Sequence, residues 1–147
     1  MWATGGTETY YCSERTFADQ NLRLATLVHE NVLAALRKVG YESPDRGVKI
    51  GHEPAYPGDP GHHLMMLGPV DDIIVRSSNM PGVLSEPLFI TCDVEAELVQ
   101  REDVQEVLAE AYADAITAFF EVKASRERAT GAAAQGGPLL LANCTTE

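Results

Sequence analysis

The chain has 147 residues, 45% of them hydrophobic, which is enough for one globular core. Its 22 acidic and 11 basic side chains give a formal charge of -11, and a surface of that sign repels the phosphate backbone of nucleic acids. We therefore expect no nucleic-acid partner. No apolar run approaches the ~20 residues that cross a bilayer, and the first residues lack the pattern of a signal peptide, so we also expect no membrane span.

The first third of the chain predicts a strand, a helix and a second strand. Thr7 to Tyr11 has the β-branched and aromatic content of a short strand. A helix is expected from Asp19 to Gly40, because apolar residues recur there at three- and four-residue intervals, namely Leu22, Ala25, Val28, Val32, Ala35, Leu36 and Val39. Val48 to Ile50, where apolar and polar residues alternate, predicts a half-buried strand.

The middle of the chain predicts a long loop and two further strands. Residues 51–70 are rich in Gly, Pro and His, and a loop of this length is more often functional than a simple connector. Ile73 to Arg76 and Gly82 to Ile90 are short apolar runs bounded by turn residues. Such runs are typical of buried central strands.

The last third predicts two helices and a tail. A short helix is expected after Asp93 and a longer one after Asp103, with an apolar stripe made of Val104, Val107, Leu108, Ala111, Ala115, Ile116 and Phe119. The acidic residues between Glu95 and Glu121 indicate a solvated helix face. Residues 123–147 carry too little apolar surface to offset the entropy of ordering, so we expect a mobile tail there. The fold class is thus α/β, with a mixed sheet and helices on both faces.

Glu86 is the candidate for chemistry, because it lies inside the apolar run from Gly82 to Ile90. A carboxylate that loses water on burial costs several kcal/mol unless it is paired or bound to a metal. Two structural interpretations remain open at this point. Glu86 could lie on a solvent face of its strand, or it could form a salt bridge with Arg76.

Arg76 and Asn79 flank the strand that leads to Glu86, at a position where loop residues of an α/β domain reach a ligand. We expect both to contact a substrate, while Arg76 could equally pair with an acidic side chain. His29 lies mid-helix, which indicates a structural or surface residue.

Three histidines in the long loop invite a metal interpretation. His52, His62 and His63 occur near Glu53 and Asp59, and imidazole is a common zinc ligand. Adjacent histidines point apart, however, and a Gly/Pro-rich loop seldom makes a tetrahedral site without anchors on rigid elements. We therefore assign no metal ligand in this chain.

Several segments occur in an order that is specific when taken together. They are Gly6 to Tyr11, Asn21 to Ala25, Asp45 to Lys49, Ile74 to Glu86, Phe89 to Ile90 and Ala113 to Ile116. This order resembles the catalytic domain of the zinc-dependent N-acetylmuramoyl-L-alanine amidases of the type-3 family. The resemblance covers about three quarters of the chain, and it is most specific from Val75 to Phe89.

The resemblance implies that Glu86 is the catalytic carboxylate of a peptidoglycan hydrolase. In that family the corresponding glutamate acts as general base on a zinc-bound water, then passes the proton to the leaving amine. The bond implied lies between N-acetylmuramic acid and the L-alanine of the stem peptide. A location in the cell wall or outside the cell follows from the same resemblance.

The family's zinc ligands would precede Met1, so the resemblance implies that residues 1–122 are the C-terminal part of an amidase-like catalytic domain. Zinc is then the expected cofactor, held by residues upstream of this chain. An alternative is a non-catalytic protein-binding or assembly module derived from the amidase fold. Such a module would use its acidic surface and residues 51–70 to contact a protein partner or the missing N-terminal segment.

Overall fold

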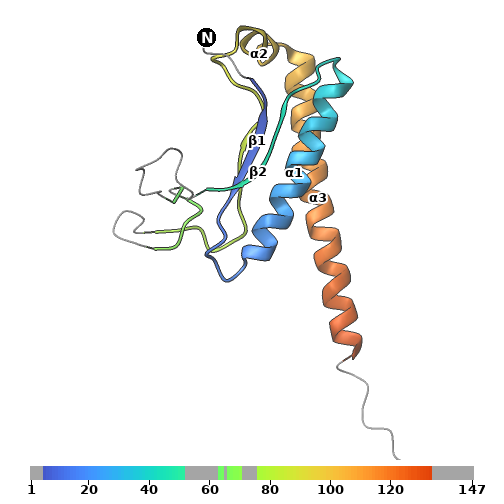
Figure 1. Ribbon diagram of the computed structural model, residues 1–147. Helices are drawn as coiled ribbons and strands as arrows, with labels where there is room; N and C mark the ends of the chain where they lie inside the picture. Colours follow the sequence, from blue (N-terminus) through green and yellow to red (C-terminus); the bar gives the residue numbers. More distant parts are fainter. Residues whose placement is uncertain (1–4, 52–62, 65, 71–75, 134–147) are drawn as a thin grey trace, which may run out of the picture.

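The computed structural model describes residues 5–51, 63–64, 66–70 and 76–133. Figure 1 shows the elements in chain order, which are β1 (Thr7–Tyr11), α1 (Ala18–Lys38), β2 (Asp45–Ile50), β3 (Leu84–Glu86), α2 (Asp93–Leu98) and α3 (Glu102–Ala133). None of the helices in this part of the chain has both the length and the apolar character needed to cross a membrane. The α/β class predicted from the sequence is confirmed.

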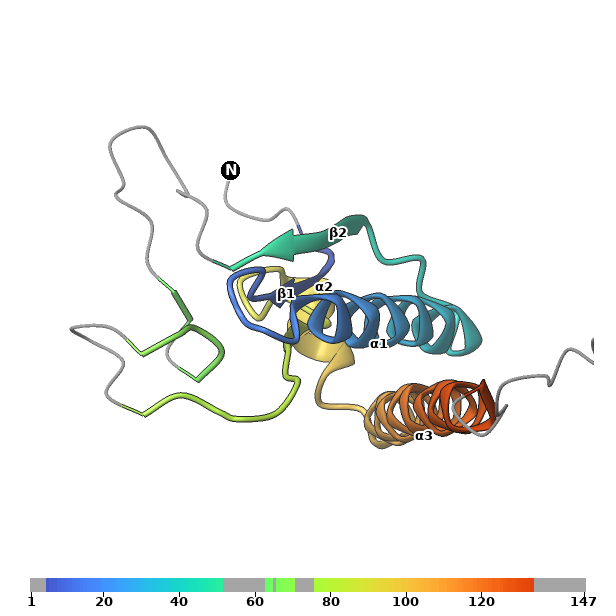
Figure 2. The ribbon, with the colours of Figure 1, turned by 90° about the horizontal axis from the view of Figure 1, so that it is seen from below.

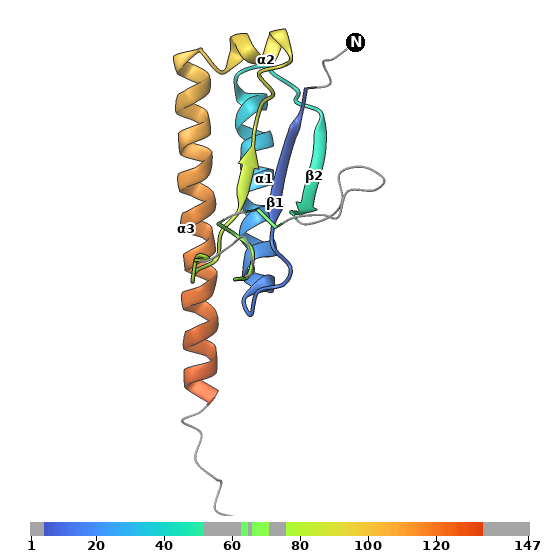
Figure 3. The ribbon, with the colours of Figure 1, turned by 90° about the vertical axis from the view of Figure 1, so that its left-hand side faces the viewer.

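The sheet is mixed, as expected, with the strand order β2-β1-β3. β1 runs parallel to β2 and antiparallel to β3. Figures 2 and 3 show that α1 and α3 lie on the same side of this sheet. The expectation of helices on both faces is therefore met on one face only within the described residues.

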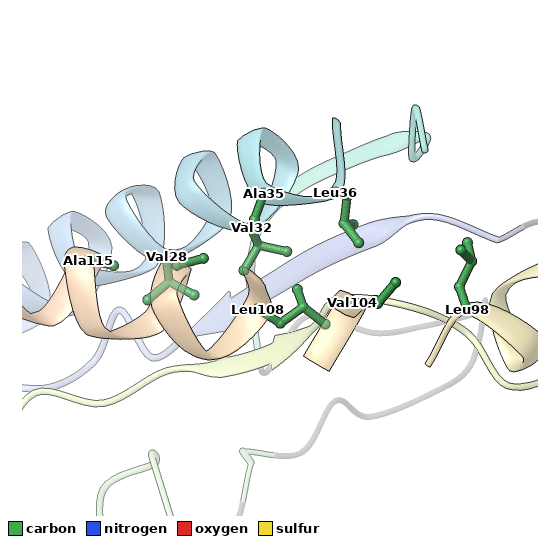
Figure 4. Close-up of a cluster of buried hydrophobic side chains, with 9 residues drawn as sticks. Val28, Val32, Ala35, Leu36, Leu98, Val104, Leu108 and Ala115 are labelled. Carbon is green, nitrogen blue, oxygen red and sulfur yellow. The ribbon is translucent and has the colours of Figure 1, made fainter. Parts of the chain in front are cut away.

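The hydrophobic core lies between α1, α3 and the sheet, and Figure 4 shows the side chains of α1 and α3 directed toward one another. It is formed by Val28, Val32, Ala35, Leu36, Leu98, Val104, Leu108, Ala111 and Ala115. The helical periodicity of the sequence thus identified most of the core. It overstated the buried face at two positions, because Leu22 is 43% and Ile116 48% exposed.

The strand that contains Glu86 is shorter and less central than the sequence predicted. It covers Leu84–Glu86 and forms an edge of the described sheet, whereas a buried strand from Gly82 to Ile90 was expected. Pro87 explains the early end, since proline has no N–H to donate to a neighbouring strand. Most of the other expected strand, Ile73 to Arg76, lies outside the described residues.

α3 continues to Ala133, past Lys123, where the tail was expected to begin. Residues 124–133 contain alanine, arginine and glutamate, whose high helix propensities favour continuation of the helix. Residues 134–147 lie outside the described part of the chain. The mobility of the segment 123–147 stays a prediction.

A buried carboxylate, Glu95, joins three segments at the end of the sheet where α2 lies (Figure 1). Its Oε1 accepts hydrogen bonds from the backbone N–H of Gly6 (2.7 Å) and the hydroxyl of Tyr41 (2.5 Å). Its Oε2 accepts one from the N–H of Phe89 (2.6 Å). The expectation of a solvated acidic face from Glu95 to Glu121 is thus wrong for Glu95, because these donors compensate for its loss of water.

Replacing Glu95 by Gln is expected to lower the free energy of unfolding by about 2–4 kcal/mol. A glutamine offers one acceptor oxygen, and its NH₂ group would face an N–H or O–H donor in a buried site. Urea unfolding followed by circular dichroism measures the loss. The matched control is Glu97→Gln, exposed on the same short helix, with an expected change below about 0.5 kcal/mol. Equal losses in the two variants would contradict the anchoring role of Glu95.

Candidate functional site

The side chains of β1 alternate between the helix side and the open side of the sheet. Thr9 points to α1, where its Oγ1 lies 3.4 Å from Nδ1 of His29. Glu8 and Tyr10 therefore point to the face that α1 and α3 leave uncovered, the face turned toward the viewer in Figure 3. Strand β1 thus places a carboxylate and a phenol on the sheet face that these helices leave uncovered.

Glu86 lies directly opposite Glu8 in the antiparallel pairing of β1 with β3. Residues opposite each other in such a ladder share a face and have neighbouring side chains. Glu86 is half-buried, and it is not the lone acidic group in an apolar strand that the sequence suggested. The structure therefore turns a single candidate into a pair of carboxyl groups.

Glu8 is enclosed by donors from two strands, and its side chain is only 5% exposed. Its Oε2 accepts from Nε of Arg46 at 2.7 Å and forms an ion pair with Nζ of Lys49. Its Oε1 accepts from the hydroxyl of Tyr10 at 2.6 Å. Burial alone would raise the pKa of Glu8, but the hydrogen bonds from Lys49, Tyr10 and Arg46 lower it to about 2.

The pKa of Glu86 is shifted in the opposite direction. Burial raises its pKa above the ordinary value, and the negative charge of Glu8 raises it further, while Lys49 and Arg46 act in the other direction. The pKa values of the two carboxyl groups are thus shifted in opposite directions. The shift favours the ionised form of Glu8 and the protonated form of Glu86. Arg76 is not among the charges that shift the pKa of Glu86, and no ion pair within the described residues joins the two.

Arg76 and Asn79, the predicted substrate contacts, are both exposed on the segment before β3. Arg15 fixes this segment, since its guanidinium donates to the carbonyl oxygens of Ser78 (2.6 Å) and Gly68 (2.8 Å). The structure brings neither residue into a contact with Glu86. Their role in substrate binding stays a prediction.

His29 is buried, in agreement with the structural role expected for it. Its Nε2 lies 2.8 Å from Oδ1 of Asp45, the first residue of β2. The hydrogen bond from His29 lowers the pKa of Asp45. His29 therefore connects α1 to the sheet, with Thr9 on one ring nitrogen and Asp45 on the other.

The described residues do not form a site for a zinc ion. Within them no group of three or more His, Cys, Asp or Glu side chains is placed to hold a metal. His63 lies with its Nδ1 4.0 Å from Sγ of Cys12 and its Nε2 3.2 Å from Oε2 of Glu14. His52, His62, Glu53 and Asp59 of the long loop lie outside the described part.

An apolar cleft of about 340 Å³ lies away from the carboxyl pair, between α1, α3 and the segment before β3. Its lining consists of Leu24, Met80, Pro81, Ile116, Phe119 and Phe120. None of these side chains can transfer a proton or bind a charge. The cleft is therefore a packing or contact surface, and the titratable pair of Glu8 and Glu86 is the candidate for chemistry among the described residues.

Sequence reasoning missed Glu8 and its cations. One signal was available, because the alternation of β1 separates Glu8 and Tyr10 from the hydroxyl residues Thr7 and Thr9. The pairing of Glu8 with Glu86 was not available, since two strands almost eighty positions apart can be aligned in several registers.

Comparisons with known proteins identify a family. A family model described as N-acetylmuramoyl-L-alanine amidase matches residues 2–118. Similar solved structures include the catalytic domain of CwlV, an N-acetylmuramoyl-L-alanine amidase from Bacillus (Paenibacillus) polymyxa var. colistinus. It is 26% identical with a TM-score of 0.55, over 82% of this chain and 51% of that one. No curated protein matches the chain.

Two further structures show the likeness of fold. The N-acetylmuramoyl-L-alanine amidase from Clostridium difficile 630 is 22% identical, with a TM-score of 0.57 over 82% of this chain and 51% of that one. The CwlD amidase from Clostridioides difficile, solved in complex with the GerS lipoprotein, is 23% identical, with a TM-score of 0.54 over 83% and 49%. The chain thus spans about half the length of the solved structures it matches.

Replacing Glu8 by Gln is expected to destabilise the fold by roughly 1–3 kcal/mol at neutral pH, because the charged hydrogen bonds from β2 are lost. The pKa of Glu8 is about 2 in the folded state against an ordinary 4.5. Its stabilising contribution is therefore fully present above pH 4.5 and disappears as the pH falls through 2. Urea unfolding at a series of pH values should show the difference between variant and wild type shrinking over that window. A difference that does not change with pH would contradict the assignment.

Proposed function

The chain belongs to the N-acetylmuramoyl-L-alanine amidase family, and from that premise we propose that it provides the catalytic carboxyl group of a peptidoglycan hydrolase. The bond cleaved is the amide between N-acetylmuramic acid and the L-alanine of the stem peptide. The observation that supports the proposal most directly is the pairing of Glu86 with Glu8 on the open face of the sheet.

Hydrolysis of an amide requires one group that removes a proton from the attacking water and returns it to the leaving nitrogen. Glu86 has the chemistry for both steps. It is half-buried, so water and substrate can reach it, and its pKa is raised toward the working range of an acid–base catalyst. In the deprotonated form it accepts the proton of water, and in the protonated form it donates to the amine.

Zinc dependence in the intact protein is part of this proposal. The described residues form no group of three or more side chains that could hold a metal, and we propose that the zinc ligands lie outside them. The contribution of this chain is then proton transfer by Glu86 and contact with peptidoglycan. The site of action would be the cell wall or the space outside the cell, where that polymer lies.

A non-catalytic binding or assembly module is the second candidate function. It is favoured by the net charge of -11, which suits a basic protein partner. Such a module would bind its partner whether or not Glu86 carries a carboxyl group. The two functions therefore differ in what a substitution at Glu86 changes.

In the natural full-length protein loaded with zinc, Glu86→Gln is expected to reduce the release of stem peptides from peptidoglycan by about 100-fold or more, because glutamine cannot exchange a proton. Mass spectrometry of the released peptides, which begin with L-alanine, measures the rate. Zinc content, measured by atomic emission, should not change.

Glu106→Gln is the matched control, since it makes the same change of charge at an exposed position of α3. Full activity of the Glu86 variant would refute the role assigned to Glu86. A wild-type protein that binds peptidoglycan or a protein partner and releases no peptide would support the binding module instead.

Arg76→Ala and Asn79→Ala are expected to raise KM for peptidoglycan fragments by about 5- to 50-fold with little change in kcat, because each removes a polar contact to substrate alone. Both residues are exposed, so their replacement should leave the midpoint of thermal unfolding unchanged. Steady-state kinetics on a soluble muropeptide tests this. An unchanged KM in both variants would remove these residues from the substrate site.

A further inference from the structure

The two facing carboxyl groups on β1 and β3 present an electrostatic problem. Like charges that lie directly opposite in an antiparallel pair destabilise the sheet. The charged and titratable groups around Glu86 are Glu8 and Tyr10 from β1 and Arg46 and Lys49 from β2. Both cations make their ion pairs with Glu8. The neutralisation is therefore one-sided, and Glu86 receives no direct ion pair from either cation among the described residues.

Ring contacts help to hold the two cations in place beside Glu8. The guanidinium of Arg46 lies over the ring of Phe89 at 5.0 Å, and the ammonium of Lys49 lies 5.6 Å from the ring centroid of Tyr10. Cations in such positions are attracted by the negative face of the ring. Each cation is thus held by an aromatic ring as well as by the carboxylate.

Tyr10 contributes the third donor. Its hydroxyl binds Oε1 of Glu8, so that both oxygens of this carboxylate are occupied. Burial and the neighbouring Glu8 raise the pKa of Tyr10, so it stays a hydrogen-bond donor at all physiological pH values. Glu8 is consequently a fixed negative charge with a fixed orientation, opposite a carboxyl group that has kept its freedom to titrate.

We infer that Glu8 is a positioning residue for Glu86: held ionised by Arg46, Lys49 and Tyr10, it fixes the proton affinity and the orientation of the facing carboxyl group. This inference rests on the proposed function of Glu86 for its catalytic meaning, and on the register of β1 and β3 for its geometry. Pairs of carboxyl groups whose surroundings separate their titration are a recurrent device for acid–base catalysis near neutral pH.

The test is a titration of the glutamate side-chain carboxyl carbons by NMR in the 147-residue chain, with Glu86 assigned from the Glu86→Gln spectrum. In Glu8→Gln the midpoint of Glu86 should move to lower pH, since the facing negative charge is gone and the cations remain. In Lys49→Met it should move to higher pH. Glu8→Asp retains the charge and should keep the midpoint on the raised side, and Glu106→Gln should leave it unchanged.

A midpoint that stays in place in Glu8→Gln, or that moves in the same direction in Glu8→Gln and Lys49→Met, would overturn the inference. Circular dichroism establishes that each variant is folded. If Glu8→Gln does not fold, Lys49→Met decides alone, and an unchanged midpoint of Glu86 in that variant rejects the inference.

The pH profile of kcat/KM in the full-length protein separates this inference from the proposed function. Glu8→Gln should shift the acid limb to lower pH, whereas a merely structural Glu8 would lower activity at every pH without moving the limb. If the NMR midpoints respond as expected and Glu86→Gln remains active, the coupling stands and the catalytic role of Glu86 fails. If the midpoints do not respond and Glu86→Gln is inactive, the positioning role of Glu8 fails alone.

Discussion

The fully buried carboxylate of Glu95 accepts hydrogen bonds from residues that precede β1, follow α1 and follow β3, and the arrangement of the sheet depends on this contact. The backbone beside Glu95 has no room for a side chain at Gly5. A Cβ atom on Gly5 would lie 2.2 Å from Oε1 of Glu95, so only glycine lets the backbone approach the carboxylate. Beside it, Oγ1 of Thr7 donates to the carbonyl oxygen of Pro87 at 2.9 Å. These contacts fix where β1 stands relative to β3, and with it which side chain faces Glu86.

The side chains of β1 alternate between hydroxyl groups on one face of the sheet and titratable groups on the other. Thr7 and Thr9 are fully buried, and Thr9 contacts α1 through His29, while Glu8 and Tyr10 lie on the other face, where Glu8 is buried among its donors. A charged face is poorly suited to packing against another apolar helix, because each desolvated charge would need a partner. Here the partners are already present within the sheet. The open face can therefore remain polar and half-exposed, which is the environment in which a carboxyl group exchanges protons with water.

The sequence predicted the elements better than their arrangement. Both long helices were identified from their periodicity, because an apolar stripe that packs on a core repeats at 3.6 residues whatever its partner is. The extent of β3 and the burial of Glu95 were missed, since each depends on contacts between distant segments: Pro87 ends the strand, and Gly6 and Phe89 supply the donors. At the site, Glu86 was selected through its apolar context and a family resemblance. Glu8 was not, because pairing across strands requires a register that composition does not encode.

The antiparallel register of β1 and β3 also limits which insertions and deletions the protein can tolerate. Since side chains alternate with a period of two, inserting or deleting one residue within β1 would move Glu8 to the helix side and bring a threonine opposite Glu86. No such parity rule applies to the connection between β2 and β3, whose length alters neither strand's alternation. Variation in length is therefore expected to accumulate in that connection. The five residues of β1 should tolerate exchange of side chains far better than any change of their number.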